Sequence, residues 1–236
     1  MSCLFGRSAG CQSTARNSAV LLWVLLVLGV SGLARSVSAE SAASAAPLES
    51  AVHAESAAHA ARPATAVFAG GCFWCTESDF EKLPGVIKAV SGYAGGRVIR
   101  PSYEAVSAGG TGHAEAVRVT YDPGRVSYAQ LVEFYWRTVD PTVRDQQFCD
   151  HGSQYRTVIF YATPAEKLIA EKSRNALLQR HAVPVIHTQI VPAGPFYVAE
   201  DYHQDYYKKN PLRYRYYRSN CGRDARLEQI WGASTH

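Results

Sequence analysis

The chain has 236 residues, of which 47% are hydrophobic, so it can build one core domain without depending on disulfide staples. Lys plus Arg is 24 and Asp plus Glu is 20, but three of the basic residues lie in the first 39 positions, which contain no acid. The remaining 21 basic and 20 acidic residues nearly balance. The charge therefore gives no support for a nucleic-acid-binding or acidic-partner class of protein.

Residues 1–39 have the layout of a secretory signal peptide. Arg7 and Arg16 precede an apolar run at residues 19–30, and small residues before Ala39 offer a cleavage site. The run is shorter than the roughly 20 residues of a membrane span. We therefore expect an exported protein, periplasmic or secreted, with no membrane contact beyond this segment. If the leader stays uncleaved, it would act as a membrane anchor.

Residues 40–64 are rich in alanine and serine, with almost no large apolar side chain. Such a segment cannot bury enough surface to offset its ordering entropy, so it is predicted to be a linker. The catalytic domain is expected over residues 65–236. Cys3 and Cys11 lie in the leader, which leaves Cys72, Cys75, Cys149 and Cys221 in the mature part of the chain.

The exported domain is predicted to be α+β. Short β-branched runs and capping signals give the order β-α-β-β-α-β, which is the signature of a ferredoxin-like split βαβ fold. A further helix begins at the Thr163-Pro164 start signal, a last strand covers residues 185–191, and an irregular tail follows. The core elements are expected at residues 66–68 (strand), 72–82 (helix), 86–93 and 114–121 (strands), 127–139 (helix, with a Ser127–Gln130 capping box) and 154–162 (strand).

Cys72 lies where a strand passes through a glycine pair into a helix. Backbone N–H groups at a helix N-terminus favour an anion, so a thiolate here is expected to have a lowered pKa and to be a good nucleophile. A buried, inert cysteine is the alternative. The glycine turn favours the reactive interpretation.

The spacing Cys72-Phe73-Trp74-Cys75 allows three interpretations. A thioredoxin-like redox pair fits the helix start, but two large aromatics between the cysteines are unusual there. A zinc site needs further ligands, which Cys149 and His151 would have to supply from one loop. In the third interpretation Cys72 is a nucleophile beside an apolar pocket.

Several separated segments together resemble the peptide methionine sulfoxide reductase A family. They are "GCFWC", "SGYAGG", "PSYEAVSAGGTGHAEAVRVTYDP", "CDHGSQYRTVIFY" and "EDYHQDYYKKNP", and the resemblance extends over residues 67–221. It implies reduction of methionine-S-sulfoxide, free or in proteins, and thus repair of oxidised proteins. Cys72 would attack sulfur and become a sulfenic acid.

The resemblance also assigns roles to pocket residues. Glu115 would be the proton donor, which requires a pKa raised by burial. The phenols of Tyr103 and Tyr155 would hydrogen-bond the sulfoxide oxygen. Phe73 and Trp74 would enclose the methyl group, and the carboxylate of Asp150 would support the site. His203 lies in a matched segment, but no catalytic role is assigned to it.

A second cysteine must resolve the sulfenic acid as a disulfide. Cys221 is favoured, because family members resolve with cysteines in the C-terminal tail, and Cys75 and Cys149 stay open as alternatives. The reductant is expected to be an external thioredoxin-like protein or dithiol, with no bound cofactor and no metal. We expect a monomer.

Two other functions compete with this one. A thiol–disulfide oxidoreductase would use Cys72 and Cys75 as its redox pair, and a small zinc-binding module would use them as ligands. The basic and aromatic tail can be typical of nucleic-acid binding. In an exported, nearly neutral protein it is better explained as a segment that wraps around the domain, so no nucleic acid is expected.

Overall fold

The computed structural model describes residues 62–232. The predicted signal peptide and nearly all of the predicted linker lie outside the described residues. The strands are β1 (Ala64–Gly70), β2 (Val86–Ala94), β3 (Ala114–Tyr121), β4 (Gln146–Gln147), β5 (Asp150–His151), β6 (Thr157–Tyr161), β7 (Gln189–Pro192) and β8 (Phe196–Val198). The helices are α1 (Phe73–Glu81), α2 (Tyr103–Ser107), α3 (Tyr128–Arg137), the 3-10 helix η1 (Ser153–Tyr155), α4 (Pro164–Gln179), α5 (Tyr206–Lys209), α6 (Pro211–Asn220) and α7 (Arg223–Trp231).

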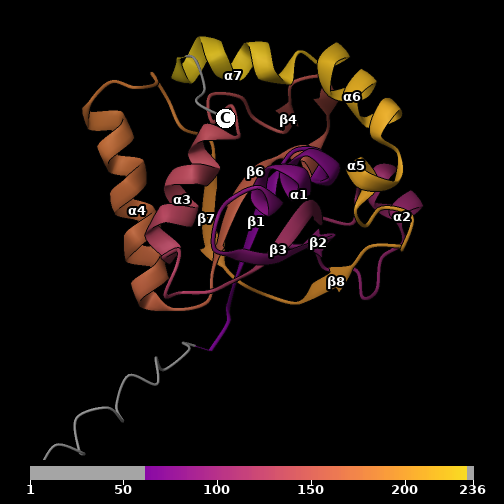
Figure 1. Ribbon diagram of the computed structural model, residues 1–236, viewed down its shortest axis with the longest axis horizontal. Coiled ribbons are helices and arrows are strands. Elements are labelled where there is room, and N and C mark those ends of the chain that lie inside the picture. The colour runs from indigo at the N-terminus through magenta and orange to yellow at the C-terminus, as the bar shows by residue number, and fades with distance from the viewer. Residues whose placement is uncertain (1–61, 233–236) are drawn as a thin grey trace, which may run out of the picture. The chain divides into compact units, whose positions relative to one another are not determined.

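A six-stranded sheet in the order β7-β6-β1-β3-β2-β8 forms the centre of the domain (Figure 1). Its four inner strands, β6-β1-β3-β2, are all antiparallel to their neighbours, and α1 and α3 connect them in the β-α-β-β-α-β order. This is the ferredoxin-like arrangement, and the predicted α+β class is confirmed. β7 adds in parallel at one edge and β8 in antiparallel at the other.

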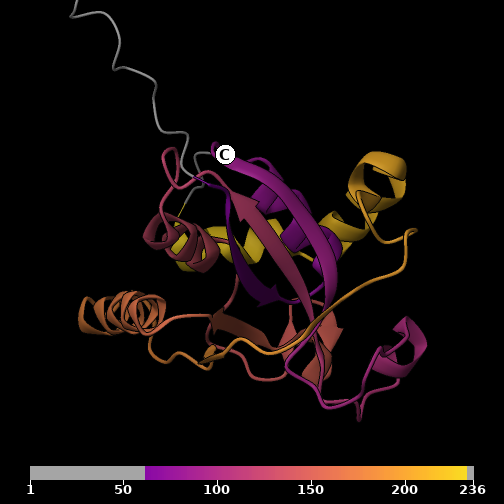
Figure 2. The same cartoon turned by 90° about the horizontal axis from the view of Figure 1, so that it is seen from below.

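One face of the sheet packs against α1 and α3. Phe68 of β1 stacks on Phe80 of α1 at 4.9 Å and on Tyr135 of α3 at 5.2 Å, so both helices contact the same strand face. Because side chains alternate along a strand, β1 turns Phe68 to this face and Ala69 to the other. Figures 1 and 2 both show α4 beside α3 at one side of the sheet and α6 at the other.

The predicted helix starts are found in the structure. The Ser127 side chain accepts from the backbone N–H of Gln130, and the Gln130 side chain accepts from that of Ser127, which makes the expected capping box of α3. Thr163 caps α4, with Pro164 in its first turn.

The tail differs from the predicted irregular segment, since it contains α5, α6 and α7. The sequence contains no signal for α6, because only Tyr214 of this helix is buried and the helix therefore has no apolar stripe. The tail is held instead by polar anchors such as Arg218, which donates to Asp79 at 2.7 Å. The short elements α2, β4, β5 and β8 were also not predicted.

Two predicted strands are shorter than expected. The segment predicted as a strand over 154–162 begins with η1 and becomes β6 only at Thr157, and the last predicted strand is confined to Gln189–Pro192. Within the described part of the chain, no helix combines the length and the apolar character needed to cross a membrane.

Candidate active site

Cys72 occupies the N-cap position of α1, at the end of the turn that follows β1. Gly71 makes this turn with a φ of +82°, a region that disfavours other residues. A Cβ atom on Gly71 would lie only 2.5 Å from Cβ of Gln147, so glycine also lets the loop of residues 140–152 pack against the turn. The glycine pair therefore places Cys72 beside this loop.

Glu115 lies on the helix-covered face of β3 and is only 3% exposed. Its Oε2 accepts a hydrogen bond of 2.9 Å from the backbone N–H of Phe73, the residue after the nucleophile candidate. Burial raises the pKa of Glu115 to about 8, although the Phe73 N–H acts in the opposite direction. The expected raised pKa is confirmed. At neutral pH the side chain holds a proton that it can donate.

Seven residues singled out from the sequence line one pocket, and one further residue joins them. Tyr103 enters from the start of α2 and Tyr155 from the end of η1. Burial raises the pKa of both phenols, so both stay protonated and can donate hydrogen bonds. The lining is Cys72, Phe73, Trp74, Tyr103, Glu115, Asp150, Tyr155 and Tyr217.

The two aromatic side chains after Cys72 are held from behind by other rings. Phe73 packs against Tyr93 at 5.9 Å. Trp74 stacks in parallel on Tyr206 at 3.6 Å and meets the edge of Tyr217 at 5.8 Å. These contacts fix an apolar wall directly beside the sulfur of Cys72.

Tyr217 of α6 is the pocket residue that the sequence analysis missed. Its hydroxyl donates to Oδ2 of Asp150 at 2.5 Å and also lies within hydrogen-bonding reach of the Cys72 thiol. Burial raises the pKa of Asp150, whereas the Tyr217 hydrogen bond lowers it. No sequence signal separates Tyr217 from the other tyrosines of the tail.

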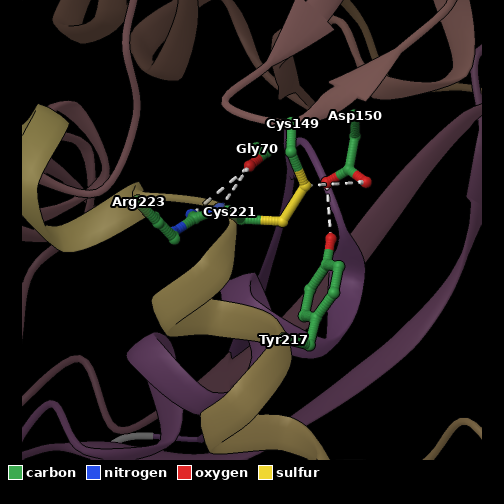
Figure 3. Close-up of a disulfide and its surroundings, with 6 residues drawn as sticks. All are labelled: Gly70, Cys149, Asp150, Tyr217, Cys221 and Arg223. Carbon is green, nitrogen blue, oxygen red and sulfur yellow. Dashed lines mark hydrogen bonds between the residues drawn. A yellow bond between two sulfur atoms is a disulfide. The ribbon is translucent and has the colours of Figure 1, made fainter.

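The four cysteines form two different pairs. Cys149 and Cys221 are joined in a disulfide, with Cα atoms 4.8 Å apart, whereas Cys72 and Cys75 are free and buried. The disulfide ties the loop that carries Asp150 to the helix that carries Tyr217 (Figure 3). In this state Cys221 is not a free thiol, while Cys75 is a direct neighbour of Cys72.

The expected lowered pKa of Cys72 is wrong for this state of the site. Burial raises its pKa well above the ordinary value, and the neighbouring Cys75 adds to this. The pKa of Cys75 is instead lowered, first by its hydrogen bond with Cys72 and then by the charges of Arg223 and Arg218. The helix N-terminus does not outweigh the loss of water around Cys72.

Two arginines, Arg223 (buried) and Arg218 (half-buried), support this part of the site. Arg223, 1% exposed, donates to the backbone oxygen of Gly70 at 3.3 and 3.4 Å and to that of Thr138 at 2.7 Å. Arg218 pairs with Asp79 at 2.7 Å. Both side chains bring positive charge close to Cys75, which favours its thiolate.

The ligand set suggested for zinc is not assembled. Among residues 62–232, potential metal-ligating groups gather at Cys149, Asp150 and Cys221, and at Glu77, Glu81 and Asp205. The first group contains the disulfide, and in the second Lys208 already forms ion pairs with Glu81 and Asp205. The His151 side chain is exposed and contacts Gln146, and neither group includes Cys72 or Cys75.

Comparison with known proteins decides the family. The family model described as "Peptide methionine sulfoxide reductase" matches residues 64–235. The chain belongs to the peptide methionine sulfoxide reductase family. It is 55% identical to peptide methionine sulfoxide reductase MsrA 2 of Caulobacter vibrioides over 168 residues, which cover 71% of this chain and 85% of that relative.

Other members of the family are also similar to this chain in sequence or in structure. MsrA of Bacillus licheniformis is 48% identical, with 71% of this chain and 93% of the relative covered. Methionine sulfoxide reductase A of Corynebacterium diphtheriae has a similar structure, with a TM-score of 0.61, 36% identity, and 64% of this chain and 76% of that chain covered. Reduced Mxr1 of Saccharomyces cerevisiae also has a similar structure, with a TM-score of 0.60 and 33% identity. The match covers 64% of this chain and 87% of that chain.

Proposed function

We propose that this protein reduces methionine-S-sulfoxide, free or within proteins, to methionine, and so repairs oxidised proteins. The observation that carries the proposal is the single pocket in which a cysteine, a protonated carboxyl, phenol donors and an aromatic wall meet. A sulfoxide offers one partner to each of these groups. Its sulfur is the electrophile, its oxygen accepts hydrogen bonds and a proton, and its methyl group is apolar.

In the first step Cys72 loses its proton and its sulfur attacks the substrate sulfur. Tyr103 and Tyr155 hydrogen-bond the oxygen, and Glu115 protonates it as the S–O bond breaks. The hydrogen bond from Phe73 to Oε2 leaves Oε1 of Glu115 to carry that proton. The protonated oxygen then bonds to the sulfur of Cys72 as the transient bond between the two sulfurs breaks. Cys72 is left as a sulfenic acid, methionine is released with the electron pair of that bond, and Glu115 recovers the proton that the thiol lost.

In the second step a thiol condenses with the sulfenic acid, which forms a disulfide and releases water. The sequence favoured Cys221 for this role. Because Cys221 is bonded to Cys149 in this structure, Cys75 is better placed, and the neighbouring arginines favour its attacking thiolate. We therefore assign the resolving role to Cys75, three residues from Cys72 in the first turn of α1.

An external dithiol must then reduce the Cys72–Cys75 disulfide. Thiolate attack on one sulfur gives a mixed disulfide, and the second thiol of the donor releases the enzyme. A thioredoxin-like protein has this chemistry, and no step needs a bound cofactor or metal. If residues 1–39 act as a signal peptide, the donor must be an exported one, in the periplasm or outside the cell.

A second candidate function is thiol–disulfide exchange by Cys72 and Cys75. It is favoured by the placement of this pair at the start of α1, where a redox pair is commonly found. The buried Glu115 and the phenols have no evident part in such an exchange.

The deciding experiment supplies each epimer of methionine sulfoxide with dithiothreitol as the reductant. We expect the S epimer alone to be converted to methionine, in free and in peptide-bound form. A protein that reduces a disulfide substrate but neither sulfoxide epimer would contradict the proposal and favour thiol–disulfide exchange.

A further inference from the structure

The basic and aromatic tail contains two arginines that its ion pairs do not use. Residues 206–220 include five basic side chains and no acid. Three of the five are engaged, since Lys208 and Arg218 form ion pairs and Lys209 donates to a backbone oxygen. The side chains of Arg213 and Arg215 in α6 are exposed and form no hydrogen bond or ion pair with the described residues 62–232. These two charges are therefore available to another molecule.

The two available arginines lie on different flanks of α6. An α-helix completes one turn in 3.6 residues, so residues four apart lie on the same face. Arg213 precedes Tyr217, which lines the pocket, by four residues and thus lies beside it at the edge of the pocket. Arg215 precedes Tyr217 by two residues, which is more than half a turn, so it lies on the opposite flank. Only Arg213 borders the pocket.

The α2 side of the pocket carries an acid in a similar place. Glu104 directly follows the pocket residue Tyr103 in the first turn of α2. Its side chain is exposed, and its carboxylate has no hydrogen bond or ion pair within the described part of the chain. A second acid, Glu200, accepts from the backbone N–H of Tyr103 at 2.9 Å. Burial and the charges of these two acids raise the pKa of Tyr202, so both acids lie close to this edge.

The pocket therefore has opposite charges at two of its edges. Figure 1 shows α6 and α2 as separate helices at the same side of the domain. Arg213 adds a positive charge beside Tyr217, and Glu104 adds a negative charge beside Tyr103. An extended peptide advances by about 3.3 Å per residue, so the residues that flank an oxidised methionine must pass over these edges.

We propose that Arg213 and Glu104 orient a peptide substrate across the pocket. An acidic residue on one side of the oxidised methionine meets Arg213, and a basic residue on the other side meets Glu104. The proposal rests on the proposed reduction of methionine sulfoxide, and it names the class of peptide that the site takes best. Because neither charge touches the sulfoxide, the pair changes the choice among peptides and not the chemistry.

The test uses two unstructured peptides of the same composition, each with one methionine-S-sulfoxide. In the first, Asp stands two residues before the oxidised methionine and Lys two residues after it, and in the second these two residues are exchanged. The net charge is the same, so general electrostatic attraction to the enzyme is the same. The quantity measured is the ratio of kcat/KM for the two orders, with dithiothreitol as the reductant.

We expect the two orders to differ about 5-fold at an ionic strength of about 0.01 M, since an exposed ion pair contributes up to about this factor. At about 1 M the ratio should approach one, because the Debye length is then only about 3 Å. The favoured order gives the direction of the peptide over the pocket. Equal rates for both orders at low salt would overturn the proposal.

Substitutions at the two edges should change the ratio in a defined way. Arg213→Gln should lower it to about 2-fold, because one of the two charge contacts is lost. The double variant Arg213→Glu/Glu104→Arg should reverse the favoured order. Arg215→Gln is the matched control, since it removes an equally exposed charge from the other flank of α6 and should keep the wild-type ratio. An equal fall in Arg215→Gln, or a double variant that keeps the wild-type order, would contradict the assignment.

A binding measurement separates this proposal from the proposed function. Fluorescence anisotropy of the two labelled peptides with Cys72→Ser needs no turnover, and the favoured order should bind more tightly. If wild type reduces no sulfoxide but the binding preference is present and reverses in the double variant, the proposed function fails and the orienting role stands. If both peptides are reduced at equal rates and bind equally, the orienting role fails and the proposed function stands.

Discussion

The two cysteine pairs of this domain differ in redox state and in burial. Cys72 and Cys75 are three residues apart, buried and free, whereas Cys149 and Cys221 are 72 residues apart, less buried and bonded. The spacing of Cys72 and Cys75 along the chain allowed a redox pair as one of three interpretations. The structure shows that the surroundings of each thiol matter more, since Cys72 lines the pocket with Cys75 buried next to it, and the second pair joins two walls of the pocket.

The sharpest test of this division is the loss of the pocket cysteine. Cys72→Ser should lower sulfoxide reduction to below about a thousandth of wild type, because a serine hydroxyl is a far weaker nucleophile at neutral pH. The Cys149→Ser/Cys221→Ser double variant should stay within about 3-fold of wild type with dithiothreitol, because it leaves both pocket thiols intact. Equal inactivation of both proteins would remove the distinction between the pairs.

The next largest effect concerns the carboxyl beside the pocket pair. Glu115→Gln should lower kcat/KM by about 100- to 10,000-fold, the usual contribution of a general acid. It keeps an oxygen that can accept from the backbone N–H of Phe73, so the fold should be preserved. A circular dichroism spectrum like that of wild type, together with the rate, separates chemistry from misfolding.

The pH dependence gives a second test of Glu115. Because its pKa is about 8 and the donor must be protonated, activity should be present below this pH and fall as pH rises through it. This descending limb in kcat/KM should be missing in the residual activity of Glu115→Gln. A limb that persists unchanged in the variant would assign the titration to another group.

A smaller effect should distinguish the resolving thiol. Cys75→Ser should release about one methionine per enzyme at nearly the wild-type rate and then slow by roughly 10- to 100-fold when a thioredoxin-like protein is the reductant. Quenched-flow measurement of methionine separates the first turnover from those that follow. If the Cys149→Ser/Cys221→Ser variant stalls after one turnover instead, the resolving thiol belongs to that pair, which contains Cys221, the residue favoured from the sequence, and the alternative Cys149.

The smallest effect on activity, but the clearest on stability, concerns the second pair. The double variant should unfold at lower denaturant, with a loss of about 2–4 kcal/mol in the free energy of unfolding, the typical contribution of a disulfide. Wild type with a strong reductant should approach the same stability. If reduction leaves the unfolding curve of wild type unchanged, the disulfide does not stabilise the domain in solution.

Local sequence signals predicted the core of the fold. The Ser127–Gln130 capping box and the alternation in β3 depend on neighbouring residues, so both could be predicted from the sequence. The path of the tail could not, because α6 buries only Tyr214 and is held by ion pairs over long sequence distances, such as Arg218 with Asp79.

The site was predictable only in part, because it too depends on contacts between residues far apart in the sequence. Resemblance to the family indicated Glu115 as the proton donor, but the alternation of β3 alone is equally compatible with a Glu115 side chain in solvent. It is buried because β3 turns it to the face covered by α1. The error over the pKa of Cys72 has a similar origin, since the helix N-terminus is a local feature, while its burial depends on Tyr217 and the loop at Asp150.

The buried anchor Arg223 has a consequence for the order in which the protein folds. Its hydrogen bonds to Gly70 join residues 153 positions apart, and contacts of such separation form late because a long loop must close first. During synthesis the turn before Cys72 emerges long before Arg223 does. The chain therefore acquires a shielded nucleophile only when it is nearly complete, and until then its pocket thiols are open to any oxidant or disulfide partner that they meet.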